Sequence, residues 1–490
     1  MNKHIFSFFF GMVFLSVTTT QAQDNQNWKA IFSLINEEVL THSKAYSSLH
    51  DATSTIGHRL TGSPNGQKAE QFAYDLLKSY GFSDVRFQPF EVESWSRKSI
   101  AVEIGGSKKH LVSVKSVSLA HSPVKADITA EIIDLGNGLE SDYIADAGKV
   151  NNKIALVNLG ILPGSPATAK NLHRSEKTAL AIKYGAKGII MVNTPDHGVL
   201  LTGTASVTGK LIPIPAICIG KEDGLDLKKA LTAGKQYAHI SMTNFSGKIN
   251  ARNVIATLPG KTIPDEKIVI GGHLDSWDLA TGAIDNGIGS FAVLDMARTV
   301  KALNLEPKRT LEFVMFMGEE EGLLGSKAYV REAISNNSID KVRFMLNYDM
   351  TNDPKGYAAL TDDCKALFQS IGTLAQSIDT SFKNSFQSGA DLHSDHQPFM
   401  LMGIPTGGAG GGSLPNNSGI CYHADCDDFS LVDEKGMQNT VRFNTMLLYG
   451  LADTDTIAAK RLDDAATKEL LLKSNLKTPL QIAGEWRWKD

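Results

Sequence analysis

The stretch Lys267–Val300, KIVIGGHLDSWDLATGAIDNGIGSFAVLDMARTV, decides the fold. It opens with a continuous apolar run, which predicts a buried strand that ends at His273. After a polar turn, residues 287–303 are mostly apolar and predict a helix. Strands that are apolar throughout and alternate with helices are typical of a parallel or mixed sheet covered on both faces. The stretch therefore predicts an α/β domain.

The same alternation extends in both directions along the chain. Strands are predicted at 309–320, at 341–350 and from Gly403, and helices at 66–82 and from about Gly325. Residues 84–95 follow the first of these helices and predict extended chain. We expect residues 23–121 and 250–455 to form one domain, a mixed and mostly parallel sheet sandwiched by helices.

Residues 122–249 differ from the segments on either side. Short apolar strands alternate there with turns, around one helix-like stretch at 175–188. We interpret this region as an inserted, mostly β lobe. Residues 456–490 predict a polar C-terminal extension, to which the sequence assigns no function.

Length and charge limit the class of protein. A chain of 490 residues is too long for one simple core, so two domains are expected. The formal net charge of −4 offers no basic field for nucleic acid.

Residues 1–22 predict a secretory signal peptide. Lys3 precedes an apolar run from Ile5 to Val17, and small residues around Ala22 suit cleavage. A membrane anchor is the alternative, but the run is shorter than the roughly 20 residues that a spanning helix needs. No later stretch is long and apolar enough to span a bilayer. We expect a secreted or periplasmic protein, which can keep disulfides.

Polar side chains gather where the predicted strands end. One strand runs into His273, the next into Glu319 and Glu320, and a third into Asp349. Ligands in open α/β sheets bind at the carboxyl ends of the strands. The three clusters therefore predict one shared site.

Each residue of this set also has a simpler explanation. Asp275 could hold the second ring nitrogen of His273, as ligating histidines require, or the two could form a surface polar pair. Asp285 could bridge two cations through its two oxygens, or it could cap a helix. Three adjacent carboxylates at 319–321 repel one another unless a cation relieves them, although a solvated acidic turn is the alternative.

Taken together, the residues predict a metal centre. Asp349 and His423 complete a set of five ligands, with one shared carboxylate, that suits two tetrahedral-like metals. The nitrogen and oxygen donors fit zinc, with manganese or cobalt as alternatives. His393 and His396 are interpreted as pocket residues and not as ligands. A glutamate beside a ligating glutamate can take a proton from water, which suits Glu319.

At this point the ordered motifs GGHLDSW, GAIDNG, GEEEG, NYDM, SDHQPF, GIPTGG and CYHADCD resemble a known family. They closely resemble the co-catalytic zinc aminopeptidases, which include secreted bacterial leucine-type aminopeptidases and the plasma glutamate carboxypeptidase group. The segment YGAKGIIMVN resembles part of a protease-associated domain, which implies that the insert is such a lobe.

The resemblance implies a role for each matched position. It pairs His273 with Asp349 on one zinc and Glu320 with His423 on the other, with Asp285 bridging both. Glu319 would be the general base and then the proton donor. Tyr422 would donate a hydrogen bond to the tetrahedral oxyanion, where negative charge develops in the transition state.

The sequence suggests different states for its cysteines. Cys218 lies in an apolar run and is interpreted as a buried free thiol. Cys421 and Cys426 are five residues apart, and a local bridge is one of the pairings that spacing leaves open. The resemblance implies that this bridge forms.

These expectations describe a secreted two-zinc exopeptidase that acts on peptides, most simply an aminopeptidase. His393 stands where the short secreted aminopeptidases have an arginine, so recognition of the free amine is open. A carboxypeptidase or dipeptidase of the plasma glutamate carboxypeptidase type is the alternative. Glutaminyl cyclases and non-catalytic receptor-like proteins are rivals that share the scaffold, although all six ligand and base positions are retained here. The sequence does not fix the oligomeric state, a homodimer included.

Overall fold

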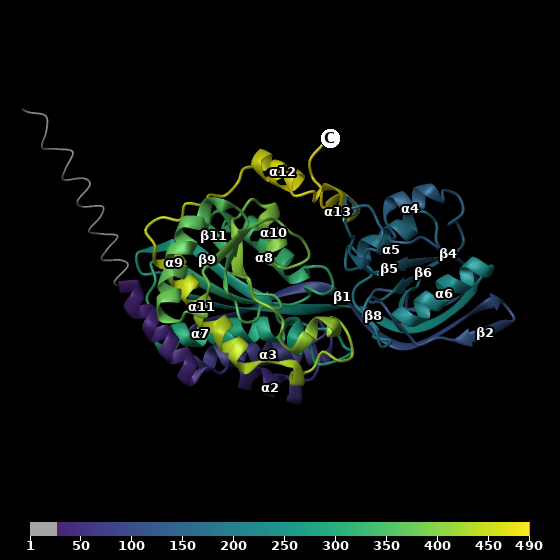
Figure 1. Ribbon diagram of the computed structural model, residues 1–490. Helices are drawn as coiled ribbons and strands as arrows, with labels where there is room; N and C mark the ends of the chain where they lie inside the picture. The colour runs from purple at the N-terminus through teal and green to yellow at the C-terminus, as the bar shows by residue number, and fades with distance from the viewer. Residues whose placement is uncertain (1–26, 490) are drawn as a thin grey trace, which may run out of the picture.

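The computed structural model describes residues 27–489, and it shows two bodies joined by a pair of long strands (Figure 1). The predicted signal peptide, residues 1–22, lies outside the described residues. No helix of the described part is long and apolar enough to cross a membrane.

The larger body contains the predicted α/β sheet, which is confirmed as mixed and mostly parallel. Its strand order is β13-β12-β14-β11-β9-β10-β8. Strand β9 pairs in parallel with β10 and β11, and β11 with β14, whereas β8 and β12 run antiparallel to their neighbours β10 and β14. The strands are β9 (Ile263–His273), β10 (Arg309–Phe316), β11 (Val342–Asn347), β12 (Gly356–Ala359), β13 (Ser385–Ser388) and β14 (Thr406–Gly410).

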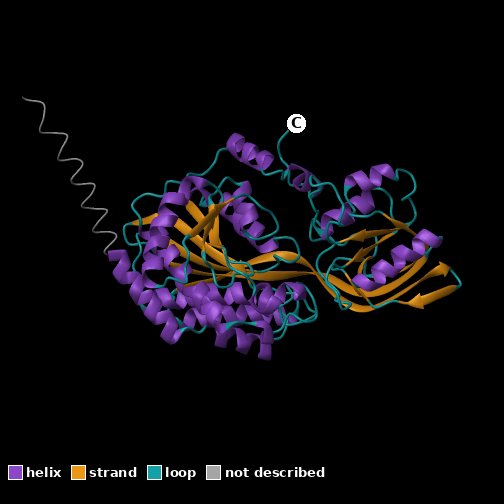
Figure 2. Cartoon of the chain, in the orientation of Figure 1, coloured by secondary structure: helices purple, strands orange, loops and turns teal. Residues whose placement is uncertain are grey.

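Helices cover both faces of this sheet (Figure 2). Alternate side chains of β9 explain the two layers: Ile268 and Ile270 pack in the core that holds α7, whereas Val269 packs with residues of α8 and α10. The helices are a stretch at 27–42, α2 (Ala45–Thr55), α3 (Pro64–Ser79), α7 (Ile288–Ala302), α8 (Leu324–Ser335), α9 (Lys365–Ile378), α10 (His396–Leu401) and α11 (Glu434–Asp453), with 3-10 turns η2 (Ile339–Lys341), η3 (Asp362–Cys364) and η5 (Phe429–Leu431).

The smaller body is the predicted insert. Its strands β4, β5, β6 and β7 pair in parallel in that order, and its helices pack on them. The elements are β2 (His110–Ser113), β3 (Ser116–Ser118), β4 (Lys125–Asp134), α4 (Glu140–Ala145), β5 (Ile154–Asn158), α5 (Arg174–Lys183), β6 (Gly188–Val192), β7 (Ala216–Ile219) and α6 (Lys221–Ala233). Cys218 of β7 is a buried free thiol, as expected.

Two long antiparallel strands, β1 (Asp84–Ser107) and β8 (Tyr237–Leu258), belong to both bodies. One end of β8 pairs with β10 of the larger sheet, and its other end pairs with β4 of the lobe. Because β8 runs unbroken across residue 250, the domain limit that we proposed at 249/250 falls within a shared strand, whereas the limit at 121/122 lies between β3 and β4. The lobe is thereby held at one side of the carboxyl ends of the larger sheet (Figure 1).

The C-terminal extension forms two further helices, α12 (Asp464–Lys473) and α13 (Lys477–Ile482). Its polar sequence predicted neither a fold nor a place for it. Figure 1 shows α12 beside the larger body and α13 between it and the lobe.

Candidate metal centre and active site

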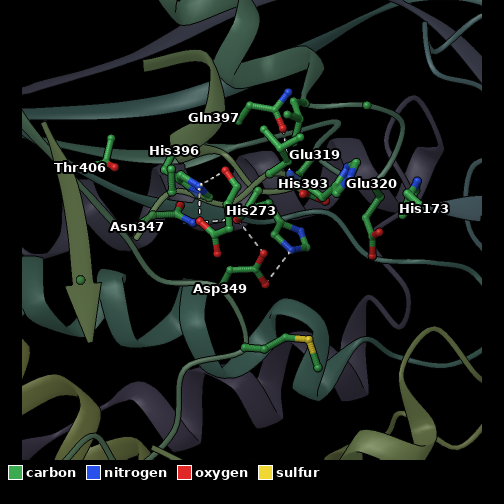
Figure 3. A pocket seen from close by; sticks show the side chains of 18 of the residues that line it. His173, His273, Glu319, Glu320, Asn347, Asp349, His393, His396, Gln397 and Thr406 are labelled. Atoms are coloured by element: carbon green, nitrogen blue, oxygen red, sulfur yellow. Dashed lines mark hydrogen bonds and ion pairs between the residues drawn. The ribbon is translucent and has the colours of Figure 1, made fainter. Parts of the chain in front are cut away.

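The predicted ligands meet at the carboxyl ends of the parallel strands. His273 is the last residue of β9, Asp349 follows the end of β11 at Asn347, and Glu320 follows the end of β10. His423 arrives from the other side, after the 3-10 turn η4 (Pro415–Cys421). Figure 3 shows His273, Glu319, Glu320 and Asp349 directed into one pocket.

Asp285 lies between the two histidines. Its Oδ1 is 3.2 Å from His273 Nε2, and its Oδ2 is 2.9 Å from His423 Nε2. Asp349 lies 3.4 Å from the same nitrogen of His273. The Oε2 of Glu320 lies 3.0 Å from the same nitrogen of His423. One carboxylate therefore joins two half-sites, each with one further histidine and one further carboxylate.

These donors are close enough to share cations. One ligand atom each from His273, Asp285 and Glu320 lies within 4.8 Å of the others, and all three residues are buried. Carboxylates in such a place repel one another at a cost in free energy, which a divalent cation offsets. The group could hold a metal ion.

The loop that carries Asp285, π-helical turn η1 (Ala283–Gly287), is fixed by buried polar groups. The carboxylate of Asp427 accepts hydrogen bonds from the N–H groups of Ile284 at 2.7 Å and Asp285 at 3.0 Å. Arg59 is fully buried and donates to the carbonyls of Leu274, Thr281 and Gly282. The N-cap of α7 is Gly287, so Asp285 is not the helix cap that its sequence position also allowed.

Asp349 is oriented by its own neighbours. Ser394 donates from Oγ to Oδ2 of Asp349 at 2.7 Å, and Asn347 donates to the same hydroxyl. Asn286 donates to the carbonyl of Tyr348, just before Asp349, and accepts from the N–H of Met350. Fixed partners of this kind hold a ligating carboxylate in one orientation.

Asp275 is buried at the site, but, contrary to our expectation, its carboxylate is not the nearest partner of His273. The Nδ1 of His273 lies 3.1 Å from the carbonyl oxygen of Asp275 and 3.6 Å from its carboxylate. The carboxylate instead lies 3.4 Å from the backbone N–H groups of both Glu319 and Glu320. Asp275 therefore links the His273 strand end to the acidic loop, and its main-chain oxygen is the nearer partner of the ring.

The three glutamates of the acidic loop have different surroundings. Glu319 and Glu320 line the cavity, and Trp277 donates to Glu320 at 2.7 Å. Burial raises the pKa of Glu319 well above its ordinary value, and the charges of Asp349 and Glu320 act in the same direction. Glu321 lies outside the cavity lining, and burial raises its pKa well above the ordinary value too.

Tyr422 stands at the edge of the cavity beside His423, with ring centroids 3.9 Å apart. It is 37% exposed, so a molecule in the cavity can reach it. Its segment is closed by the expected disulfide, Cys421–Cys426, which the structure contains. The carbonyl of His423 accepts a hydrogen bond from the N–H of Thr202, which belongs to the lobe.

The lobe supplies a wall of the cavity, which has a volume of about 670 Å³. Arg174, at the start of α5, is buried there beside Tyr422. Its guanidinium lies against Gly203, where a Cβ would come within 1.9 Å of Nε. The sequence patterns did not reveal Arg174, because no motif marks a residue that a separate lobe brings to the site.

His393 and His396 both line the cavity, as expected of pocket residues. His393, at the position that departs from the family pattern, stacks on His173 of the lobe with ring centroids 4.6 Å apart. His396 lies 2.9 Å from the carboxylate of Asp391. Neither histidine is part of the group formed by His273, Asp285 and Glu320.

Comparisons with known proteins agree with this geometry. Residues 253–448 match the model of peptidase family M28, and residues 124–227 match the model of the PA domain. Carboxypeptidase Q of Mus musculus is 25% identical over 421 residues, which cover 84% of this chain and 86% of that protein.

Two solved structures share the architecture. The aminopeptidase from Aneurinibacillus sp. strain AM-1 is 26% identical, with a TM-score of 0.64, over 87% of this chain and 98% of that one. A peptidase M28 precursor from Shewanella amazonensis SB2B, at 22% identity, has the same fold with a TM-score of 0.76, over 90% of this chain and 100% of that one. The resemblance drawn from the motifs is confirmed: residues 253–448 match peptidase family M28, and residues 124–227, inserted ahead of them, match the PA domain.

Proposed function

We propose that this chain is a two-zinc exopeptidase that removes the amino-terminal residue from peptides. One observation carries the proposal: the two oxygens of Asp285 face the Nε2 atoms of two different histidines, at 3.2 and 2.9 Å. A carboxylate in that position suits a pair of cations, because each of its oxygens can serve one of them.

The residues present fit zinc. His273 and Asp349 would hold one ion, His423 and Glu320 the other, and Asp285 both, all with the nitrogen and oxygen donors that zinc accepts. The buried Oε1 of Glu320 has no hydrogen-bond partner among the described residues, so it is free to serve as a ligand atom. When bound, two zinc ions would polarise the peptide carbonyl and make water a better nucleophile.

Glu319 would manage the protons. Its carboxyl group reaches the cavity beside Glu320 and Asp349. As general base it takes a proton from the attacking water, and it then delivers that proton to the nitrogen of the leaving amine. This transfer restores the carboxylate for the next turnover.

Tyr422 would stabilise the oxyanion of the tetrahedral intermediate by donating its phenolic hydrogen. Desolvation of its hydroxyl group raises the pKa of Tyr422, so the phenol keeps its proton at neutral pH. Its ring stacks on that of His423, which holds it at the cavity edge. A donor fixed in advance is most effective where charge appears only in the transition state.

A second candidate, a carboxypeptidase or dipeptidase mode, is favoured by Arg174. Arg174 and Lys327 are the arginine and lysine side chains that line the cavity, and Lys327 is already paired with Glu485 at 2.5 Å. A guanidinium that lines a cavity can bind the terminal carboxylate of a short peptide.

Three substrates separate the two modes. Aminoacyl-nitroanilides have a free amine without a carboxylate, N-blocked dipeptides have a carboxylate without an amine, and free dipeptides have both. The aminopeptidase mode predicts hydrolysis of the nitroanilides and the free dipeptides. Activity confined to blocked and free dipeptides would replace that mode with the second candidate, and no hydrolysis of any of them would remove the exopeptidase proposal.

If Arg174 binds a carboxylate, Arg174→Ala should raise KM for free dipeptides by about 10- to 100-fold, the effect of one charge-assisted hydrogen bond. It should leave KM for the matching dipeptide amides nearly unchanged. Lys183→Ala is the control, because Lys183 lies on the same helix outside the cavity. Equal effects on dipeptides and their amides would limit Arg174 to the positioning of Tyr422.

We also propose that the protein is exported. The predicted signal peptide and the Cys421–Cys426 disulfide support a secreted or periplasmic location, where such bridges persist.

A further inference from the structure

The C-terminal extension reaches the substrate cavity, although its sequence indicates no function. Ala483 and Glu485 line the cavity together with the metal-site residues. We use the name C-terminal strap for residues 464–488, which contain α12, α13 and the chain that follows them.

The strap is anchored to the larger body by apolar side chains. Leu471 and Leu480 are fully buried in a cluster with Leu360 and Met400. Trp486 and Trp488 pack against that cluster, with their ring centroids 4.8 Å apart. Burial of two whole leucine side chains anchors the strap to the larger body.

The strap also touches the lobe. Helix α13 packs against α5, the helix that begins at Arg174, and Ile482 packs on the core of the lobe. The strap therefore spans the opening between the two bodies on the side where the cavity lies.

Glu485 connects the strap to both loops of the site. Its Oε1 accepts from Lys327 Nζ at 2.5 Å, and Lys327 also donates to the carbonyl of Gly322 in the acidic loop. Its Oε2 accepts from Gln397 Nε2 at 2.7 Å, while the Oε1 of Gln397 accepts from the N–H of His393. One carboxylate thus joins the chain terminus to the loop of the general base and to the loop of His393.

We propose that the C-terminal strap is the end wall of the substrate cavity and limits the enzyme to short peptides, with Glu485 as the specificity-determining residue. The inference rests on the proposed exopeptidase function and adds the length of its substrates. Because Glu485 is neutralised by Lys327, it acts by occupying space and not by offering a charge to the substrate. A longer peptide must displace the strap, and its hydrophobic anchor opposes that.

The test compares kcat/KM for a dipeptide, a tripeptide and a pentapeptide with the same amino-terminal residues, using the zinc-loaded full chain. The wild type should prefer the dipeptide to the pentapeptide, and Glu485→Ala should reduce that preference by about tenfold, the effect of one lost interaction. Glu485→Gln keeps the volume of the side chain and should retain the preference. Glu469→Ala, at an exposed position of α12, should leave it unchanged.

A chain that ends at Ala483 is the second variant, since it removes Glu485 and both tryptophans while keeping Leu471 and Leu480. It should lose the length preference as Glu485→Ala does. An unchanged preference in both variants, or a wild type that cleaves the pentapeptide as well as the dipeptide, would overturn the end wall while leaving the proposed function intact. Loss of the preference in Glu485→Gln as well would assign the effect to charge and overturn the wall. A wild type that hydrolyses no peptide would instead overturn the proposed function.

Discussion

Glu319→Gln is expected to lower kcat for a short peptide by about 10²- to 10⁴-fold, the usual contribution of a general base. Glutamine has nearly the shape of glutamate, so the cavity and the neighbouring ligand Glu320 should keep their positions. It cannot accept a proton from water, and the same atom cannot return one to the leaving amine. Steady-state kinetics and zinc content should be measured on the same preparation.

Glu321→Gln is the matched control for that variant. Glu321 is two residues away, lies outside the cavity lining, and has its pKa raised well above the ordinary value by burial. Because the side chain of Glu321 does not line the cavity and glutamine keeps its size, turnover should change little. A Glu319→Gln enzyme with wild-type kcat would assign the proton transfer to another group.

Asp285→Asn is expected to have the second large effect, on the metals themselves. An amide has one ligand oxygen and no charge, so the bridge between His273 and His423 is lost. Loss of supporting groups around metal ligands already costs about 10- to 100-fold in affinity, and loss of a bridging ligand should cost more. Competition with a chromophoric chelator measures the change, and Asp363→Asn at an exposed position is the control.

A variant of Asp285 that held zinc as tightly as the wild type would contradict the bridging role. If one zinc were lost and the other retained, the two half-sites would be unequal, and the one that still binds would identify the stronger pair. Either His273 with Asp349 or His423 with Glu320 would then be the tighter half-site.

Much of the fold and the metal-site cluster could be predicted, because the pattern that places them is local in the sequence. His273, Glu320 and Asp349 each follow an apolar strand, and the parallel arrangement of those strands places their ends at one edge. The prediction needed only the strand pattern and the rule that such ends form ligand sites. The motifs added Asp285 and His423, which no strand pattern could have brought to the same place.

The residues that shape the substrate cavity could not be predicted in this way. Arg174 and Glu485 reach it from the lobe and from the C-terminal strap, far along the chain from the metal ligands. Their positions depend on how the long strands β1 and β8 orient the lobe and on how α13 packs against α5. No local sequence pattern indicates that packing. The catalytic residues could therefore be predicted from the sequence, whereas the substrate specificity could not.

For Asp275, the contact in the structure differs from the contact that we expected from the sequence. The sequence suggested that its carboxylate would hold His273, because the two residues are two positions apart. In the folded chain the carbonyl of Asp275 is nearer to the ring, and the carboxylate faces the backbone of the acidic loop. Spacing alone could not distinguish the main-chain oxygen from the side chain.

The central claim is that five side chains hold two metals around one bridging carboxylate. Metal analysis of the purified, active protein tests it most directly, with activity followed as a chelator removes metal and zinc is returned. We predict close to two zinc ions per chain, loss of activity with the metal, and recovery with zinc. A chain that remained active after all metal had been removed would contradict it.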